Sequence, residues 1–336
     1  MRQGNHTPRL VGMITMTLVL AGARGDAQAT APRRAFQVTY VAHIDHLPAT
    51  ANEVQVWVPL ATTRDGQRVV RRTVQTAVPY DIATEPMYGN EMLHATLQAP
   101  VRQPVEFLVE YEAVVQGGNR LTAPSATVSP AMQAMSLQAE RLTVIDETVR
   151  RLAAEATRGR ATTLDRARGI YDAVIRRMRY DKTTPGWGRG DVARACVVGR
   201  GHCTDFHALF IAMARAAGIP ARFKIGATIP TDPSATVPGY HCWAEFYLPE
   251  HGWIPVDASE AWKHPERAGQ YFGAEDENKF TISLGRDMRL VPPQRGEPVN
   301  IFIKPYVEVD GKPFEDVQIQ FRFRNESPQQ GGSHEG

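Results

Sequence analysis

The sequence predicts an α+β fold, in which an antiparallel β domain precedes a segment that is first helical and then rich in strands. From Ala35 to about Gly118, apolar residues mostly alternate with polar ones, which is the pattern of strands with one buried face. Between Leu142 and Val174 the apolar residues recur instead at steps of three and four, as on one face of a helix. Strand patterns return after residue 220, and helices followed by an antiparallel sheet are typical of the α+β class.

The first 29 residues have the pattern of a secretory signal peptide. Arg2 and Arg9 lie in a basic head, and the apolar run Leu10–Ala23 is too short to span a bilayer as a mature helix. The small residues of Ala27-Gln28-Ala29 predict cleavage after Ala29. We therefore expect a periplasmic or extracellular protein with no membrane anchor after cleavage.

Charge and length limit the classes of function. Loss of residues 1–29 removes three arginines and one aspartate, so the formal net charge of +2 becomes zero. No basic tract remains that would bind nucleic acid. The chain has 336 residues, of which 43% are hydrophobic, and is long enough for two hydrophobic cores.

The β domain is predicted over residues 30–124. Alternating runs that start at Phe36, Val54 and Val105 indicate its strands, and turn residues such as Asp65-Gly66 separate them. The pattern favours a sandwich. Because the domain contains no cysteine, we expect it to have a structural or substrate-presenting role.

The segment 125–289 begins with helices. One is expected from Leu142 to Leu152, and a second from Leu164 to Val174, capped by Thr163 or Asp165. A third begins at Cys203 and ends at Gly218. Strands are then expected over residues 221–229, 240–248 and 253–257.

The C-terminal region 290–326 is again rich in strands. Val317, Ile319, Phe321 and Phe323 alternate with polar residues. This extension either completes the sheet of the preceding segment or forms a small third module. Residues 327–336 contain almost no apolar side chain to bury and are expected to be disordered.

Three residues in this order offer a nucleophile, a base and an orienting acid: Cys203, His241 and Asp257. A thiol attacks well only as thiolate, and a position at a helix start beside an imidazole favours the charged form. The imidazole in turn needs a group that holds its tautomer and orientation, which a carboxylate can do. The sequence therefore predicts a cysteine triad.

The hairpin that carries His241 and Asp257 gives this prediction a geometric consequence. The two side chains share a face only if the connecting loop has an odd number of residues. A five-residue loop from Leu248 to Gly252 would pair Tyr247 with Trp253 and Trp243 with Asp257. His241 would then be diagonal to Asp257, at roughly 7 Å between backbones.

Other polar residues near Cys203 can compete for these roles. Asp205 would raise the pKa of the thiol unless it caps backbone N–H groups, so we assign it a structural role. His207 lies one helical turn after Cys203 and could act as the base, but the sequence offers it no orienting carboxylate. Cys203 is the odd cysteine of three, and Cys196 and Cys242 either form a bridge or remain buried free thiols.

Four motifs together resemble the bacterial transglutaminase-like family, part of the broad papain-like group of thiol acyl-transfer enzymes. They are Gly201-x-Cys203-x-Asp205, Gly218-Ile219-Pro220-Ala221-Arg222, His241-x-Trp243-x-Glu245 and Gly252-Trp253-x-x-x-Asp257. The resemblance covers about residues 165–260 and implies a catalytic domain at 125–289. It assigns Cys203 as nucleophile, His241 as base and Asp257 as orienting acid. His202 and His207 depart from the family pattern, and Tyr180 and Trp187 are candidates for the second oxyanion donor.

The resemblance implies thiolate attack on an amide carbonyl to form an acyl-enzyme. Because water is in excess unless a site excludes it, we expect hydrolysis of a peptide or protein substrate, with no cofactor. Amide transfer and a catalytically silent peptide-binding module are the alternatives. A metal site built from His202, Cys203, Asp205, His207, His241 and Cys242 is a weaker rival, because the spacing lacks paired Cys-x-x-Cys motifs.

Overall fold

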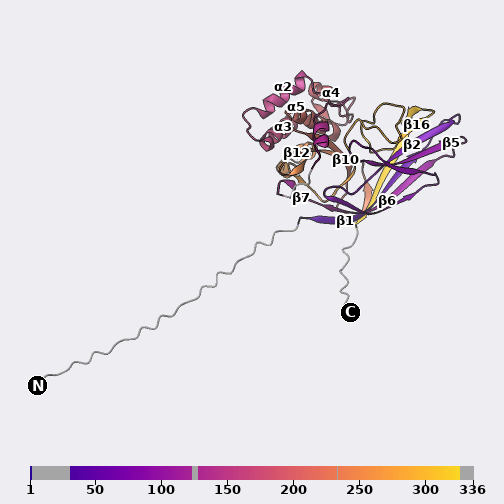
Figure 1. The fold of residues 1–336 in the computed structure, drawn as a ribbon, viewed down its shortest axis with the longest axis horizontal. Helices are drawn as coiled ribbons and strands as arrows, with labels where there is room; N and C mark the ends of the chain where they lie inside the picture. The colour runs from indigo at the N-terminus through magenta and orange to yellow at the C-terminus, as the bar shows by residue number, and fades with distance from the viewer. Residues whose placement is uncertain (2–30, 123–127, 233, 326–336) are drawn as a thin grey trace. The chain divides into compact units, whose positions relative to one another are not determined.

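The computed structural model describes residue 1 and residues 31–122, 128–232 and 234–325. Apart from residue 1, the predicted signal peptide at 1–29 lies outside the described ranges, as does the predicted disordered tail at 327–336. Figure 1 shows the described chain, with the helices α2 to α5 gathered beside the strands β10 and β12.

Two five-stranded antiparallel sheets account for most of the strands within these described residues. The first has the order β11-β18-β1-β6-β3 and the second the order β17-β16-β2-β5-β4. The strands of the first sheet are β1 (Arg33–Ile44), β3 (Gln67–Gln75), β6 (Val105–Gln116), β11 (Ser234–Val237) and β18 (Val317–Asn325). Those of the second are β2 (Glu53–Leu60), β4 (Asp81–Thr84), β5 (Glu91–Gln98), β16 (Tyr306–Val309) and β17 (Lys312–Phe314).

Alternate side chains of both sheets enter a shared hydrophobic core. Phe36 and Val38 of β1, Val54 of β2 and Phe107 of β6 are fully buried and belong to one cluster. Burying one face of each sheet against the other removes the apolar stripe of every strand from water. The period-two pattern therefore corresponds to a β-sandwich.

The C-terminal strands complete this sandwich, which differs from both alternatives expected for residues 290–326. β18 pairs with β1 from Ile44↔Val317 to Phe36↔Asn325, and β16 pairs with β2. The apolar face of β18 must be buried against other apolar side chains. Without the C-terminal strands, β1 and β2 would each have one edge whose backbone groups are unpaired, and a strand from the far end of the chain can pair there. Local sequence cannot show which edge is chosen.

Helices and a four-stranded sheet form the rest. The helices are α1 (Pro130–Met135), α2 (Glu147–Thr157), α3 (Thr163–Arg177), α4 (Val192–Val198), α5 (Cys203–Ala216) and α6 (Ala258–Lys263), with short 3-10 turns at Arg120–Thr122 and Pro265–Arg267. The sheet has the order β13-β12-β10-β15, with β10 (Ala221–Thr228), β12 (His241–Leu248), β13 (Gly252–Val256) and β15 (Lys279–Leu284). Two-stranded pairs join β7 (Gly118–Asn119) to β14 (Ala274–Glu275) and β8 (Arg179–Tyr180) to β9 (Arg200–Gly201).

Helix α5 is the central element among the helices and the four-stranded sheet. Its residues from Cys203 to Arg215 are all buried, and it packs against β10 and β12 on one side and against α2 and α3 on the other. Gly218, with φ of +75°, follows the helix and allows the left-handed turn that ends it. The predicted helix from Cys203 to Gly218 is confirmed.

Two predicted helix starts differ from the structure, the start of α2 by five residues and that of α3 by one. α2 begins at Glu147 and not at Leu142, because the carboxylate of Asp146 accepts the N–H of Val149 at 2.9 Å and caps the helix there. α3 is capped by Thr162, whose hydroxyl accepts the N–H of Asp165 at 3.0 Å. Several residues in each stretch could serve as the cap, and only the backbone path selects one.

Candidate active site

Cys203 is the first residue of α5, and its side chain is fully buried. The N–H groups in the first turn of a helix have no partner within the helix, and the helix dipole adds a partial positive charge at the same end. Both effects favour a thiolate over a thiol at Cys203.

Asp205 ties the start of α5 to the loop ahead of it. Its carboxylate accepts N–H groups from Gly188 at 2.7 Å, Gly190 at 3.0 Å and His202 at 2.8 Å. A Cβ at Gly201 would overlap this carboxylate, so position 201 requires glycine. The negative charge of Asp205 is thus directed at backbone donors, which supports the structural role assigned to it.

Replacing Asp205 with alanine should lower the free energy of unfolding by about 2–4 kcal/mol, because three N–H groups lose a charged acceptor. Urea denaturation measures the change. Asp316→Ala is the matched control: Asp316 pairs with the exposed His46, and its loss should cost no more than about 0.5 kcal/mol. Equal effects of the two substitutions would contradict the structural role of Asp205.

His241 and Asp257 meet across the predicted hairpin. Tyr247 pairs with Trp253, as predicted, but the strands continue to a Leu248–Gly252 pair, so the turn is shorter than expected. The predicted pairing of Trp243 with Asp257 does not form, because the N–H of Asp257 bonds the carbonyl of Tyr271 and the ladder ends one pair earlier. The register nevertheless puts both side chains on one face, and His241 Nε2 lies 2.7 Å from Asp257 Oδ2.

Asp257 is held at both carboxylate oxygens. Oδ1 accepts the hydroxyl of Ser259 and the N–H of Glu260, each at 3.0 Å, which also caps α6. Oδ2 accepts Lys279 Nζ at 2.7 Å in addition to His241. Burial alone would raise the pKa of Asp257, but the charges of Lys279 and His241 hold it well below its usual value. The carboxylate is therefore anionic and fixed in orientation.

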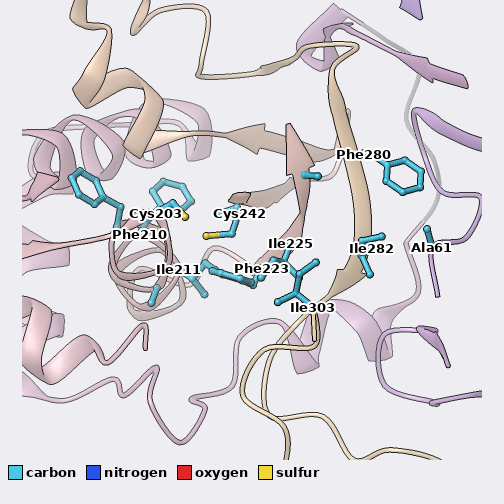
Figure 2. Packing of buried hydrophobic residues seen from close by; sticks show 14 of the residues in the cluster. Ala61, Cys203, Phe210, Ile211, Phe223, Ile225, Cys242, Phe280, Ile282 and Ile303 are labelled. Carbon is cyan, nitrogen blue, oxygen red and sulfur yellow. The ribbon is translucent and has the colours of Figure 1, made fainter. Parts of the chain in front are cut away.

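The thiol and the imidazole favour each other's charged forms. Burial alone would raise the pKa of Cys203, but contacts with Cys242, His202 and His241 and the charge of His241 hold it well below the usual thiol value. Burial alone would lower the pKa of His241, but Asp257 and Cys203 raise it to about 9. Figure 2 shows Cys203 and Cys242 side by side between α5 and the sheet. The two shifts are in the directions that favour a thiolate–imidazolium pair.

His202 touches the sulfur of Cys203 but is poorly oriented to act as its base. The sulfur of Cys203 lies 3.1 Å from Nδ1 and 3.6 Å from Nε2 of His202. Because the two nitrogens are at similar distances, the sulfur lies against the ring and not along one N–H direction. The rings of Tyr180, Trp187 and Tyr240 surround His202 at centroid distances of 5.4–5.6 Å.

His207, the other rival base, has a carboxylate neighbour after all. Its Nε2 lies 3.5 Å from Asp257 Oδ1 and accepts the N–H of Ala258 at 3.0 Å. The sequence offered His207 no orienting carboxylate, and the structure brings Asp257 close to it. The chain folds α6 back onto α5, a contact between residues about fifty positions apart that the sequence does not show. Because Nε2 accepts the N–H of Ala258, this nitrogen ties the start of α6 to α5 and has no free lone pair with which to act as the base.

A cleft of about 590 Å³ opens beside His241 and is also lined by Tyr180, Trp187, His202 and Lys279. Both candidates for the second oxyanion donor, Tyr180 and Trp187, therefore face the cleft. Which of them serves as the donor stays a prediction. A second cavity, of about 690 Å³, lies among residues of β3, β5 and β6, and its lining does not include Cys203, His241 or Asp257.

Cys196, Cys203 and Cys242 are all free thiols, so the bridge considered for Cys196 and Cys242 is not formed. Within the ranges that the structure describes, no three His, Cys, Asp or Glu side chains are placed to hold a metal ion. The groups of the rival metal site face different partners: Asp205 faces backbone N–H groups, and His241 faces Asp257. In the same ranges, no helix combines the length and apolar character needed to cross a bilayer.

Residues 150–258 match the family model of the transglutaminase-like superfamily, and this range contains Cys203, His241 and Asp257. The chain carries a transglutaminase-like core domain. The resemblance predicted from its motifs is therefore confirmed, as is the mixed fold with an antiparallel sheet behind the helix that bears Cys203. This transglutaminase-like core, with a buried thiol beside an imidazole, supports a thiol enzyme.

Individual proteins resemble this chain to different extents. An uncharacterized protein of Haemophilus influenzae is 33% identical over 183 residues, which are 45% of this chain and 50% of that protein. This chain thus matches about half the length of that relative. The crystal structure of a proposed cysteine protease from Cytophaga hutchinsonii aligns with 88% of this chain and 99% of its own, with a TM-score of 0.56 at 14% identity. The periplasmic domain of TgpA from Pseudomonas aeruginosa covers 72% of this chain and 94% of its own at 20% identity, with a TM-score of only 0.37.

Sequence reasoning missed Lys279 as part of this site. The residue is the first of β15, a strand in which all six residues are buried. A lysine at the start of an apolar alternating run is a weak signal, because such a residue usually extends to solvent. Only the packing of β15 beside β10 places its ammonium group against Asp257.

Proposed function

We propose that this protein is an exported thiol enzyme that hydrolyses peptide-type amide bonds through an acyl-enzyme on Cys203. The observation that supports this most directly is the 2.7 Å bond between His241 and Asp257 beside a buried thiol whose pKa is held well below its usual value. In this proposal Cys203 is the nucleophile, His241 the acid–base group and Asp257 the orienting acid.

Acylation begins with attack of the Cys203 thiolate on the amide carbon. Because Nε2 of His241 is bound to Asp257, Nδ1 is the nitrogen left to exchange a proton with sulfur and substrate. The carbonyl π bond opens to an oxyanion, which N–H groups at the start of α5 can stabilise. The imidazolium then gives its proton to the leaving nitrogen, the C–N bond breaks, and a thioester and a free amine result.

In deacylation, the proton transfers run in the opposite direction. Neutral His241 removes a proton from water, the resulting hydroxide adds to the thioester carbon, and the C–S bond breaks to leave a carboxylic acid and Cys203. The cleft beside His241 is open, so water can reach the acyl group. An amine that enters the same cleft would give amide transfer instead.

A peptide library incubated with the purified mature protein distinguishes these outcomes. We expect new carboxyl termini in mass spectra, with 18O from labelled water in the product. Isopeptide products in the presence of an added primary amine, without incorporation of 18O, would show that transfer is the main reaction. Export is tested separately by the amino terminus of protein recovered from the periplasmic fraction, which we expect at Thr30.

The two shifted pKa values predict the pH dependence of amide cleavage. Lowering the pKa of Cys203 keeps the thiolate present well below the usual thiol range, and raising that of His241 to about 9 keeps the imidazolium present up to that pH. The rate constant kcat/KM should therefore have a basic limb near 9 and an acidic limb well below it.

The control for this prediction is His241→Gln, in which the acidic limb of Cys203 alkylation by iodoacetamide should move up toward about 8.5, the value of an ordinary thiol. A basic limb of kcat/KM near about 6.5, the value of a free imidazole, would contradict the ion pair.

A further inference from the structure

Lys279 is a buried cation bound to the orienting carboxylate. Only 4% of the residue is exposed, and its Nζ lies 2.7 Å from Asp257 Oδ2. That same oxygen lies 2.7 Å from His241 Nε2. The other oxygen, Oδ1, already accepts Ser259 and Glu260. Lys279 therefore meets the triad at the one carboxylate oxygen that His241 uses.

Sharing one oxygen between two cations has both a geometric and an electrostatic consequence. With Oδ1 held by Ser259 and Glu260 and Oδ2 held by Lys279, the carboxylate cannot rotate away from the imidazole. The positive charge of Lys279 also offsets part of the field that Asp257 exerts on His241, since a third charge a few ångströms away acts strongly in a buried site. Full charge on Asp257 alone would bind the proton of His241 more tightly.

We propose that Lys279 is a positioning residue that fixes Asp257 and limits how firmly His241 holds its proton. The proposal rests on the proposed function, because it takes His241 as the group that must both accept and release a proton. A base that never releases its proton cannot assist water in deacylation. Lys279 thus keeps the proton affinity of His241 within a range where both acylation and deacylation proceed.

The other charges around Lys279 are consistent with a permanent cation. Burial alone would lower the pKa of Lys279, but Asp257, together with Asp276 and Glu275 on the segment before β15, raises it. Lys224 on β10 is itself bound to Glu245 and Glu275, at 3.0 and 2.9 Å. The phenol of Tyr271 also lies within the field of Asp257 and Lys279.

The charges around His241 identify Lys279 as the group to change. Asp257 and Cys203 stabilise the imidazolium, and Trp243 stacks beside the His241 ring at a centroid distance of 5.9 Å. Nε2 of His207 lies 3.5 Å from Oδ1 of Asp257, the oxygen that does not bind His241. That nitrogen accepts the N–H of Ala258. Removal of Lys279 therefore leaves the His241 imidazolium as the cation at Oδ2 of Asp257, without the second positive charge that Lys279 supplies there.

The experiment compares Lys279→Met, Lys279→Gln and Lys279→Arg with the unchanged protein. The imidazole of His241 is titrated by NMR, with the resonance assigned through His241→Gln, and the basic limb of kcat/KM is measured in parallel. We expect the pKa of His241 and the basic limb to rise by about one to two pH units in the Met and Gln variants. We also expect kcat to fall by about tenfold through the looser carboxylate, and the Arg variant to return both pH values toward those of the unchanged protein.

Lys312→Met is the matched control, because Lys312 is an exposed lysine on β17, in the second sheet of the sandwich. It should change neither pH value. If folded Met and Gln variants keep the pKa of His241 while only their stability falls, Lys279 is merely structural and the proposal is overturned. The NMR titration needs no turnover, so it tests Lys279 even if cleavage by Cys203 is never found, an outcome that would overturn the proposed function alone.

Discussion

Cys203→Ala is expected to abolish both amide cleavage and labelling by a thiol-directed electrophile. The substitution removes the sulfur that the proposed mechanism uses to form the thioester, while alanine fills most of the buried site at the start of α5. Loss of a covalent nucleophile should reduce kcat/KM by at least about a thousandfold. Mass spectrometry of the chloroacetamide-treated protein measures labelling, and peptide cleavage is measured in the same samples.

Cys196→Ala is the matched control for this substitution. Cys196 is a buried free thiol on α4, and burial raises its pKa, so it should react slowly and contribute nothing to turnover. The Cys196→Ala variant should keep both labelling and cleavage. Cleavage that persists in Cys203→Ala would show that another group is the nucleophile.

Asp257→Asn is expected to produce the second largest loss, about 10²–10⁴ in kcat. The amide oxygen must remain at the Oδ1 position to accept Ser259 and Glu260. The amide nitrogen then faces His241 Nε2 and Lys279 Nζ, both of which need an acceptor. The proton of neutral His241 would move to Nδ1, leaving the thiol without a base. An unpaired Lys279 should also cost about 3–5 kcal/mol of stability.

Two measurements separate these effects. Urea denaturation gives the loss of stability, and the pH dependence of Cys203 alkylation gives the loss of the ion pair, with an acidic limb that moves upward. Asp172→Asn is the control, because Asp172 forms a partly exposed pair with Arg168 on α3. This substitution should leave both the stability and the acidic limb of alkylation unchanged. If the folded Asp257→Asn protein has a normal kcat and an unchanged acidic limb of Cys203 alkylation, Asp257 has no role in the mechanism.

Much of the local structure could be predicted because burial follows a short repeat. Alternating Phe36, Val38 and Tyr40 fit only a strand with one buried face, and β1 has that burial pattern. The helix at Cys203 could be placed because Gly218 marks its end. Helix starts were less certain, since Asp146 and Thr162 compete with neighbouring residues that can also cap.

The site could be predicted to the extent that it depends on one hairpin. Odd loop length fixes the face of each strand residue, so the meeting of His241 and Asp257 follows from the register of Tyr247 and Trp253. Lys279 and His207 reach the same carboxylate from β15 and α5. No local period encodes those two contacts.

The sequence by itself determined which chemical groups are present, in what order, and which residues of each strand and helix are buried, because those properties depend on neighbours a few positions apart. Only the tertiary structure decided that β18 pairs with β1, that α6 returns to α5, and that a buried lysine shares Asp257 with His241. Such pairings are selected by the burial of whole surfaces and the neutralisation of charges far apart in the chain, which no single segment specifies.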